Sequence, residues 1–196
     1  MKKIRLAVIV GSNRRESINR RLAVALARLG EGRFDAEFVK IDDLPMYNYD
    51  LEEDRPASVR RFIDQVAGAH TVLFVTPEHN RSIPAVLKNA IDWGSKPMEH
   101  NVWKGKTVAI TGTSPGAIGT AVGQQHLRQI LGILGSLVMG GEAYISFSPG
   151  LVDEAGDVTA ERTRAFLIDF VDQLAALATY LELGREAANA QAMTSA

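Results

Sequence analysis

The chain has 196 residues, of which 22 are Lys or Arg and 23 are Asp or Glu, so its formal net charge is −1. This balance argues against a nucleic-acid-binding protein, because such proteins carry a clustered basic excess that displaces counterions from phosphates. The length favours one domain, and 46% hydrophobic residues can form a sizeable core. Cysteine is absent, which excludes disulfides, thiolate metal sites and thiol nucleophiles, so redox chemistry needs a bound cofactor.

The first apolar run, residues 4–10, is too short to cross a membrane. It leads directly into Gly11 and Ser12, without the small-residue cleavage site of a signal peptide. We therefore expect a cytoplasmic protein that binds neither membranes nor nucleic acid.

Short apolar runs alternate along the chain with stretches whose apolar residues recur at helical spacing. The runs are residues 4–10, 34–41, 71–76, 107–111 and, less regularly, 137–145. The helical stretches are residues 18–29, 59–66, 86–91, 127–134 and 166–181. Strands that alternate with helices predict an α/β fold with a parallel sheet covered on both faces, because each parallel crossover needs a helix.

The second run differs from the others because Asp35, Glu37 and Lys40 interrupt it, as is typical of an edge strand. An edge position for this strand favours a flavodoxin-like three-layer sandwich with a five-stranded parallel sheet in the order 2-1-3-4-5.

Residues 1–183 form the predicted domain. Residues 184–196 are rich in Ala, Asn and Gln without clear periodicity, so we expect a mobile tail or a partner contact.

Ligands of such sheets bind beyond the carboxyl ends of the strands, where the strand order reverses. The loops there are residues 11–19, 77–82 and 112–119, and all three are rich in polar residues, Gly or Pro. In the first loop, Ser12, Ser17, Asn19 and the charge of Arg14 surround a helix N-terminus, which suits a terminal phosphate. The alternative is an ordinary helix cap at Ser17, but a cap needs only one such residue.

The first loop matches neither the G-x-x-x-x-G-K-[ST] phosphate loop nor G-x-G-x-x-G, which counts against an ATPase and a standard dinucleotide site.

In the second loop, Pro77 and Pro84 stiffen a backbone that suits a flat ligand. Glu78 and His79 are an alternative acid–base pair, although no nucleophile stands near them. The four histidines are too scattered in the sequence to predict a metal site.

The third loop contains Gly112, Gly116 and Gly119, which allow a ligand close to the backbone. It is superficially like the T-G-x-x-x-G-x-G loop of short-chain dehydrogenases. It follows the fourth run rather than the first, however, and the chain has no Tyr-x-x-x-Lys pair, so we exclude that family.

Together the three loops, the segment Ser82–Trp93 after the second loop, and the segment Asp43–Asn48 resemble the NADPH-dependent FMN reductase family, in particular its bacterial chromate and quinone reductases. The resemblance covers residues 4 to about 181. It implies that Ser12, Arg14, Ser17 and Asn19 hold the FMN phosphate. It also implies that Pro77, Glu78, His79 and Asn80 line the isoalloxazine ring, with Ser114 and Gly116 on its other side. The family commonly has tyrosine in place of His79, and a histidine can also pack flat on the ring.

The resemblance predicts a ping-pong oxidoreductase that passes electrons from NADPH or NADH through FMN to quinones, chromate, azo compounds or free flavin. Such a protein needs no further catalytic residues, since the flavin carries the hydride chemistry. A flavodoxin-like electron carrier is the main alternative, but a net charge of −1 gives little electrostatic steering toward a protein partner. The third hypothesis is a flavin-free scaffold, in which case the purified protein would be colourless.

The resemblance also implies a homodimer or homotetramer with FMN near the subunit boundary. Arg128 and Glu142 match family positions between dimers, and ordinary surface charges are an equally good interpretation. Arg15 or Arg81 could favour the extra phosphate of NADPH, although a solvated arginine is the commoner case.

Overall fold

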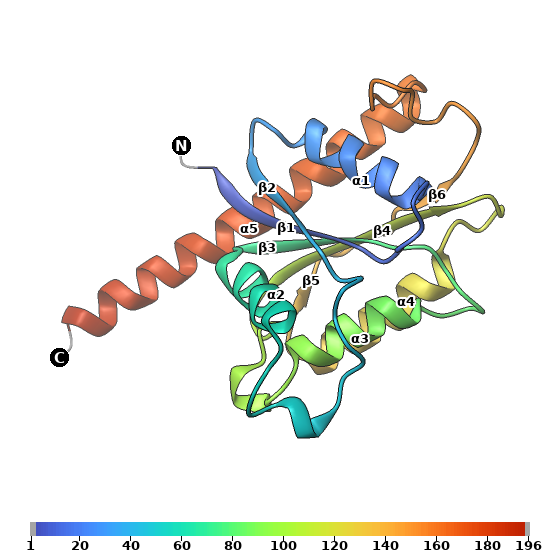
Figure 1. Cartoon of the computed structure of the whole chain (residues 1–196). Coiled ribbons are helices and arrows are strands. Elements are labelled where there is room, and N and C mark those ends of the chain that lie inside the picture. The colour runs from blue at the N-terminus through green and yellow to red at the C-terminus, as the bar shows by residue number, and fades with distance from the viewer. Residues whose placement is uncertain (1–2, 195–196) are drawn as a thin grey trace.

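A parallel sheet in the predicted order 2-1-3-4-5 forms the centre of the computed structural model, which describes residues 3–194. The strands, in sheet order, are β2 (Phe34–Val39), β1 (Ile4–Val10), β3 (Thr71–Val75), β4 (Thr107–Ser114) and β5 (Leu137–Val138). A further strand, β6 (Tyr144–Ser146), pairs in parallel with the end of β4. The carboxyl ends of β1, β3 and β4 point to the same edge of the sheet (Figure 1).

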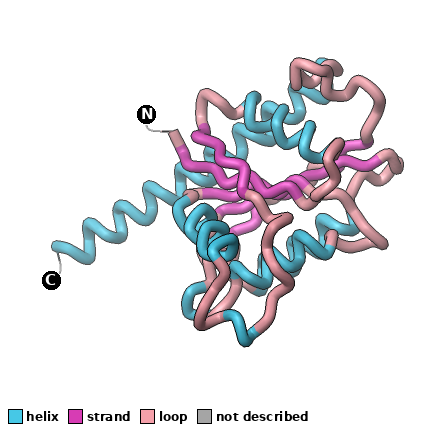
Figure 2. The backbone as a smooth tube through the Cα atoms, in the orientation of Figure 1, coloured by secondary structure: helices cyan, strands magenta, loops and turns pink. Residues whose placement is uncertain are grey.

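Helices cover both faces of the sheet and give the predicted three layers (Figure 2). On one face lie α1 (Ile18–Leu29) and α5 (Glu161–Thr194), and on the other lie α2 (Ala57–Gly68), α3 (Ala85–Gly94) and α4 (Ala121–Ile133). Alternate strand residues supply the two cores: Leu6 and Val8 face the first pair of helices, whereas Ala7 and Ile9 face the other three. Two short 3₁₀ helices, Tyr49–Leu51 and Met98–His100, lie in the connections.

The fifth predicted strand is divided in two, because Gly140 and Gly141 interrupt it and Gly141 has φ +79°. The fourth strand is longer than predicted. Gly112 and Thr113, expected in a loop, belong to β4, since β6 offers them a hydrogen-bonding partner strand. The third loop therefore begins after Ser114.

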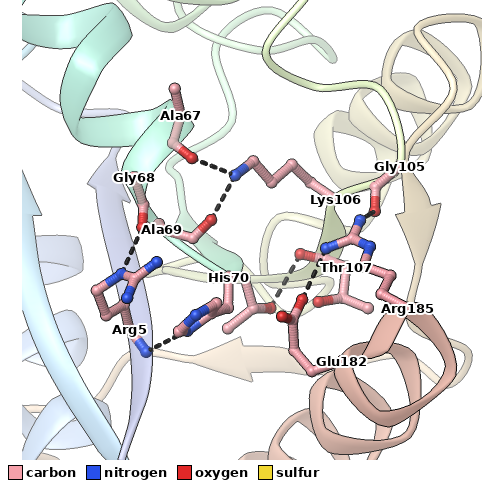
Figure 3. Close-up of polar contacts among 11 residues, drawn as sticks. Arg5, Ala67, Gly68, Ala69, His70, Gly105, Lys106, Thr107, Glu182 and Arg185 are labelled. Atoms are coloured by element: carbon pink, nitrogen blue, oxygen red, sulfur yellow. Dashed lines mark hydrogen bonds and ion pairs between the residues drawn. The ribbon is translucent and has the colours of Figure 1, made fainter. Parts of the chain in front are cut away.

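Helix α5 continues through Gly184 to Thr194, where the sequence pattern indicated no helix. The reason is composition, since Ala, Gln, Glu, Arg and Met favour helix even without an apolar stripe. Arg185 holds this part to the body by donating to the carbonyl of Gly105 at 2.5 Å (Figure 3). That residues 184–196 are mobile stays a prediction, and 195–196 lie outside the described residues. No helix within residues 3–194, α5 included, is both long and apolar enough to cross a membrane.

Candidate functional site

The three predicted loops leave strand ends that lie in close contact. A Cβ atom on Gly11, at the end of β1, would lie 2.3 Å from the hydroxyl oxygen of Thr76, which follows β3. One on Gly112 in β4 would lie 2.0 Å from the carbonyl oxygen of Thr76. Only glycine fits at these two positions, and the close approach brings the first, second and third loops to one place.

The first loop presents donors around the start of α1. Ser17 caps the helix, because its Oγ accepts a hydrogen bond from the amide of Arg20 at 3.2 Å. The backbone amides of Ile18 and Asn19, in the first turn, have no carbonyl partner within a helix. Ser12 is partly exposed, and the guanidinium of Arg14 is exposed with no ion pair to any residue in the range 3–194. This donor set suits a phosphate.

The side chain of Asn19 is engaged within the protein. Its Oδ1 accepts from the amide of Thr113 at 2.9 Å, and its Nδ2 donates to the carbonyl of Thr113 at 2.9 Å. The side chain is 1% exposed, so it joins α1 to β4 and leaves only the backbone amide of Asn19 for a phosphate. An asparagine that pairs with a backbone 94 residues away has no signature in the sequence.

The second loop contains a tight turn between His79 and Ser82, whose amides and carbonyls exchange two hydrogen bonds of 2.9 Å. The two central residues, Asn80 and Arg81, have φ of +50° and +63°, as in a type I′ turn. Asn tolerates this conformation but Arg strains it, and strained residues of this kind concentrate at functional sites. Pro77 precedes the turn, so the backbone of this loop is rigid.

Glu78 connects the second loop to α4. Its carboxylate accepts from the amide of Gly123, in the first turn of α4, at 3.0 Å, and pairs with Arg81 at 3.3 Å. The side chain is only 10% exposed. Among the described residues Glu78 makes no hydrogen bond to His79, whose side chain is exposed, so the pair is not arranged for acid–base catalysis.

The third loop leaves β4, the neighbour of β3 in the sheet, so it lies beside the second loop. The hydroxyl of Ser114 donates to the carbonyl of Gly119, which closes the loop on itself. Gly116 is exposed, and a Cβ there would have only the Oγ of Ser114 nearby, at 3.6 Å. The backbone at Gly116 is thus open to a flat ligand.

Three supporting residues escaped the sequence prediction: Thr76, Thr113 and Gly123. Each acts through backbone or close packing with a residue distant in sequence. The only signal was position, because Thr76 ends a predicted apolar run and Thr113 lies in the third predicted loop. Ser82 also contacts α4, with its Oγ 3.1 Å from Nδ1 of His126.

Two further predicted positions have partners inside the chain. Arg128 donates to the carbonyls of Met139 and Gly141 at 2.8 and 2.5 Å. Glu142 accepts from Gln125 at 2.7 Å. Their role between subunits stays a prediction. No group of three or more His, Asp or Glu within residues 3–194 is placed to hold a metal ion.

The sheet order and the position of the three loops define a flavodoxin-like α/β protein whose first loop presents donors suited to an anion. Residues 4–150 match the model of the NADPH-dependent FMN reductase family, and the chain belongs to that family. It is thus a reductase of this class.

Relatives and solved structures agree with this assignment. The chain is 47% identical over 174 residues to a 2-hydroxy-1,4-benzoquinone reductase of a Burkholderia species, covering 88% of this chain and 95% of the relative. It is 45% identical over 172 residues to a quinone reductase of Pseudomonas putida, covering 87% and 92%. Among solved structures it is similar to FerB, a flavoenzyme NAD(P)H:(acceptor) oxidoreductase from Paracoccus denitrificans, with 43% identity, a TM-score of 0.88, and coverage of 90% and 98%.

Proposed function

We propose that the protein binds FMN at the three loops and transfers electrons from NAD(P)H to a quinone. The observation that carries the proposal is the first loop, where donors gather at the point of strand reversal. They are a capped helix N-terminus, Ser12, and Arg14, which has no ion pair within residues 3–194. The Thr76 contacts place this donor set beside the second and third loops. FMN fits these residues, with its phosphate at the first loop and its ring between the other two.

When bound, FMN supplies the centre that accepts a hydride and returns electrons. The chain binds and orients it. Ser12, Ser17 and Arg14, with the amides of Ile18 and Asn19, would hold the phosphate. Pro77, His79 and Asn80 would line one side of the ring, while Glu78 fixes this loop to α4 through Gly123. Ser114 and Gly116 would line the other side. A rigid second loop keeps its backbone donors in place, so that they tune the cofactor without reorganisation.

We propose that the nicotinamide and the acceptor use the same space over the ring in turn, which gives ping-pong kinetics. The relatives from Burkholderia and Pseudomonas putida are both quinone reductases, which favours quinones as the acceptor class. Chromate, azo compounds and free flavin are further acceptors that a solvent-accessible ring can reduce.

The test starts with the visible spectrum of the purified protein after it has been incubated with FMN and desalted. A flavin spectrum with close to one FMN per chain is expected. Oxidation of NADPH by the loaded protein with benzoquinone should then give parallel double-reciprocal lines. A protein that stays colourless refutes the proposal, and one that holds FMN but oxidises neither NADPH nor NADH with any quinone is an electron carrier instead.

We further propose that the protein is a homodimer or homotetramer. Several large apolar side chains are exposed in the connection after β2, in the third loop and on α4, which favours a partner subunit. They include Met46 (73% exposed), Ile118 (47%) and Ile133 (83%). Light scattering on the FMN-loaded protein gives the number of subunits, and a monomer at micromolar concentration refutes the proposed homo-oligomer.

A further inference from the structure

A hollow of about 370 Å³ lies beside the first loop, between it and the end of β2. We call it the β2-side hollow. Its charged lining consists of Arg14, Arg15, Arg20, Lys40 and Asp42. Four cations and one anion around a small volume create a positive potential, so the hollow suits an anionic ligand.

The cations of the β2-side hollow have few partners within the protein. No carboxylate in residues 3–194 forms an ion pair with Arg14, Arg15 or Arg20. Lys40 is 3.9 Å from Asp42 and 3.8 Å from Asp43, at the limit of an ion pair. Asp43 is engaged more closely by Arg61, at 2.8 and 2.9 Å, which holds the pKa of the Asp43 carboxyl below its ordinary value. The neighbouring carboxylates thus leave the positive charge of the hollow largely uncompensated.

Arg20 is also oriented. Its guanidinium lies over the ring of Phe38, 5.6 Å from the centroid, and both side chains line the hollow. A guanidinium held on an aromatic ring loses less freedom when it binds an anion, and its planar fork matches phosphate oxygens. The pair therefore prepares one side of the hollow for a phosphate.

A second, larger hollow of about 800 Å³ adjoins the other side of the first loop, and it is less suited to an anion. Arg14, Arg15 and Arg20 line this hollow as well, but its other two arginines, Arg21 and Arg28, already donate to the carbonyls of Val152 and Ala155. Its lining also contains three carboxylates, from Glu16, Asp153 and Glu154. The β2-side hollow is therefore the stronger candidate.

The position of the β2-side hollow identifies its ligand. The sheet order places β1 between β2 and β3, so the hollow lies about two strand spacings, about 10 Å, from the end of β3 and the proposed flavin ring. A dinucleotide whose nicotinamide covers that ring can extend along the same edge, so that its adenosine end reaches the β2-side hollow. NADPH differs from NADH there by one phosphomonoester, on the adenosine 2′-oxygen.

The geometry points to the β2-side hollow as the site that recognises the adenosine 2′-phosphate of NADPH, with Arg15 and Arg20 as its specificity-determining residues. This inference rests on the proposed function, and it separates Arg14, assigned to the FMN phosphate, from its two neighbours. It predicts a preference for NADPH over NADH.

The test compares wild type with Arg15→Gln, Arg20→Gln and the double variant, and uses Arg162→Gln as the control. Arg162 is exposed on the first turn of α5, outside the hollow, and its replacement removes the same charge. Calorimetry on FMN-loaded protein measures binding of adenosine 2′,5′-bisphosphate, 5′-AMP and inorganic phosphate. Steady-state kinetics gives kcat/KM for NADPH and NADH.

We expect the double variant to bind adenosine 2′,5′-bisphosphate at least tenfold more weakly, since each lost bond to a charged group is worth about a factor of ten or more. Its kcat/KM ratio of NADPH to NADH should fall by a similar factor. A further variant, Arg20→Lys, should bind adenosine 2′,5′-bisphosphate more tightly than Arg20→Gln does. Arg162→Gln should match wild type in both the affinity for the bisphosphate and the kcat/KM ratio.

Three outcomes overturn the inference: an unchanged ratio in the double variant, inorganic phosphate that binds wild type as tightly as the bisphosphate, or loss of FMN together with the bisphosphate. The last result assigns these arginines to the flavin phosphate. If the protein takes up no FMN at all, the proposed function fails, and calorimetry with the bisphosphate on the purified protein still decides whether the hollow binds it.

Discussion

The two edges of the sheet both gather basic side chains, but they use them differently. At the amino-terminal edge the cations reach backbone carbonyls (Figure 3). Arg5 donates to Gly68 at 2.5 Å, and Lys106 donates to Ala67 at 2.9 Å and also to Ala69. These carbonyls end α2, where a helix leaves its last C=O groups without partners. The charges here complete a helix terminus.

At the carboxyl-terminal edge, Arg14, Arg15 and Arg20 have neither carbonyl nor carboxylate partners among residues 3–194. They surround the start of α1, whose free groups are N–H donors of the same sign as the arginines. Positive groups next to a positive helix end do not stabilise the fold. The difference indicates that the edge whose cations lack protein partners is the one suited to an anionic ligand. Each prediction below tests one side of this contrast.

The largest expected effect concerns the tight convergence of strands at the carboxyl-terminal edge. Gly112→Ala places a methyl group against the backbone of Thr76, which cannot rotate away, so we expect the free energy of unfolding to fall by about 3 kcal/mol. Urea denaturation measures it. Gly132→Ala in α4 is the control: nothing lies within 4 Å of the new Cβ, and helix propensity should raise stability by about 0.5–1 kcal/mol. If the Gly112→Ala protein is as stable as wild type, β4 does not approach the backbone of Thr76 as closely as the structure shows.

Arg14→Ala and Arg5→Ala should have opposite consequences. Removing Arg14 should weaken FMN binding by about 1.5–3 kcal/mol, the value of one hydrogen bond between charged groups, and leave the stability of the apoprotein unchanged. Removing Arg5 should lower apoprotein stability by only about 0.5 kcal/mol, because the exposed carbonyl of Gly68 loses its donor but can bind water, and should leave FMN affinity unchanged. Flavin titration and urea denaturation on both variants measure this. Wild-type FMN affinity in Arg14→Ala removes the phosphate assignment.

The contrast also explains what the sequence could predict. Periodicity identified the bounds of β1 and α1 because each is a long, regular apolar pattern. The first loop was predictable because its donors follow one another in the chain. The hydrogen bonds of Asn19 to Thr113 and of Glu78 to Gly123 could not be predicted, because such pairings depend on tertiary structure alone. The roles of Asn19 and Glu78 in ligand binding stay predictions.

A smaller effect is expected from Lys106 at the amino-terminal edge. Burial, with a contribution from the nearby Arg185, lowers the pKa of Lys106 from 10.5 to about 8. Between these two pH values the unfolded chain binds more protons than the folded one, so Lys106 makes the free energy of unfolding rise with pH. Partial exposure and the two carbonyl partners limit this rise to about 1 kcal/mol.

Lys106→Met should abolish that rise. Urea denaturation of wild type and variant at pH 7.5 and 10 measures it, and the stability of wild type relative to the variant should increase at the higher pH. Lys88→Met, which removes an exposed lysine paired with Asp92, controls for the lost charge. A constant difference between wild type and Lys106→Met across this range refutes the role of burial.

The smallest effect is expected for Arg185, the outermost cation of the amino-terminal edge. Its bonds to Gly105 and Glu182 are exposed, so Arg185→Ala should change global stability by less than about 0.5 kcal/mol. Its local effect should be larger, because these bonds hold the end of α5 to the body. Amide hydrogen exchange over residues 186–194 should therefore become faster in the variant, while Arg164→Ala, at the other end of α5, should leave it unchanged. If these amides already exchange at unprotected rates in wild type, the anchor has no measurable effect and the prediction of a mobile tail is correct.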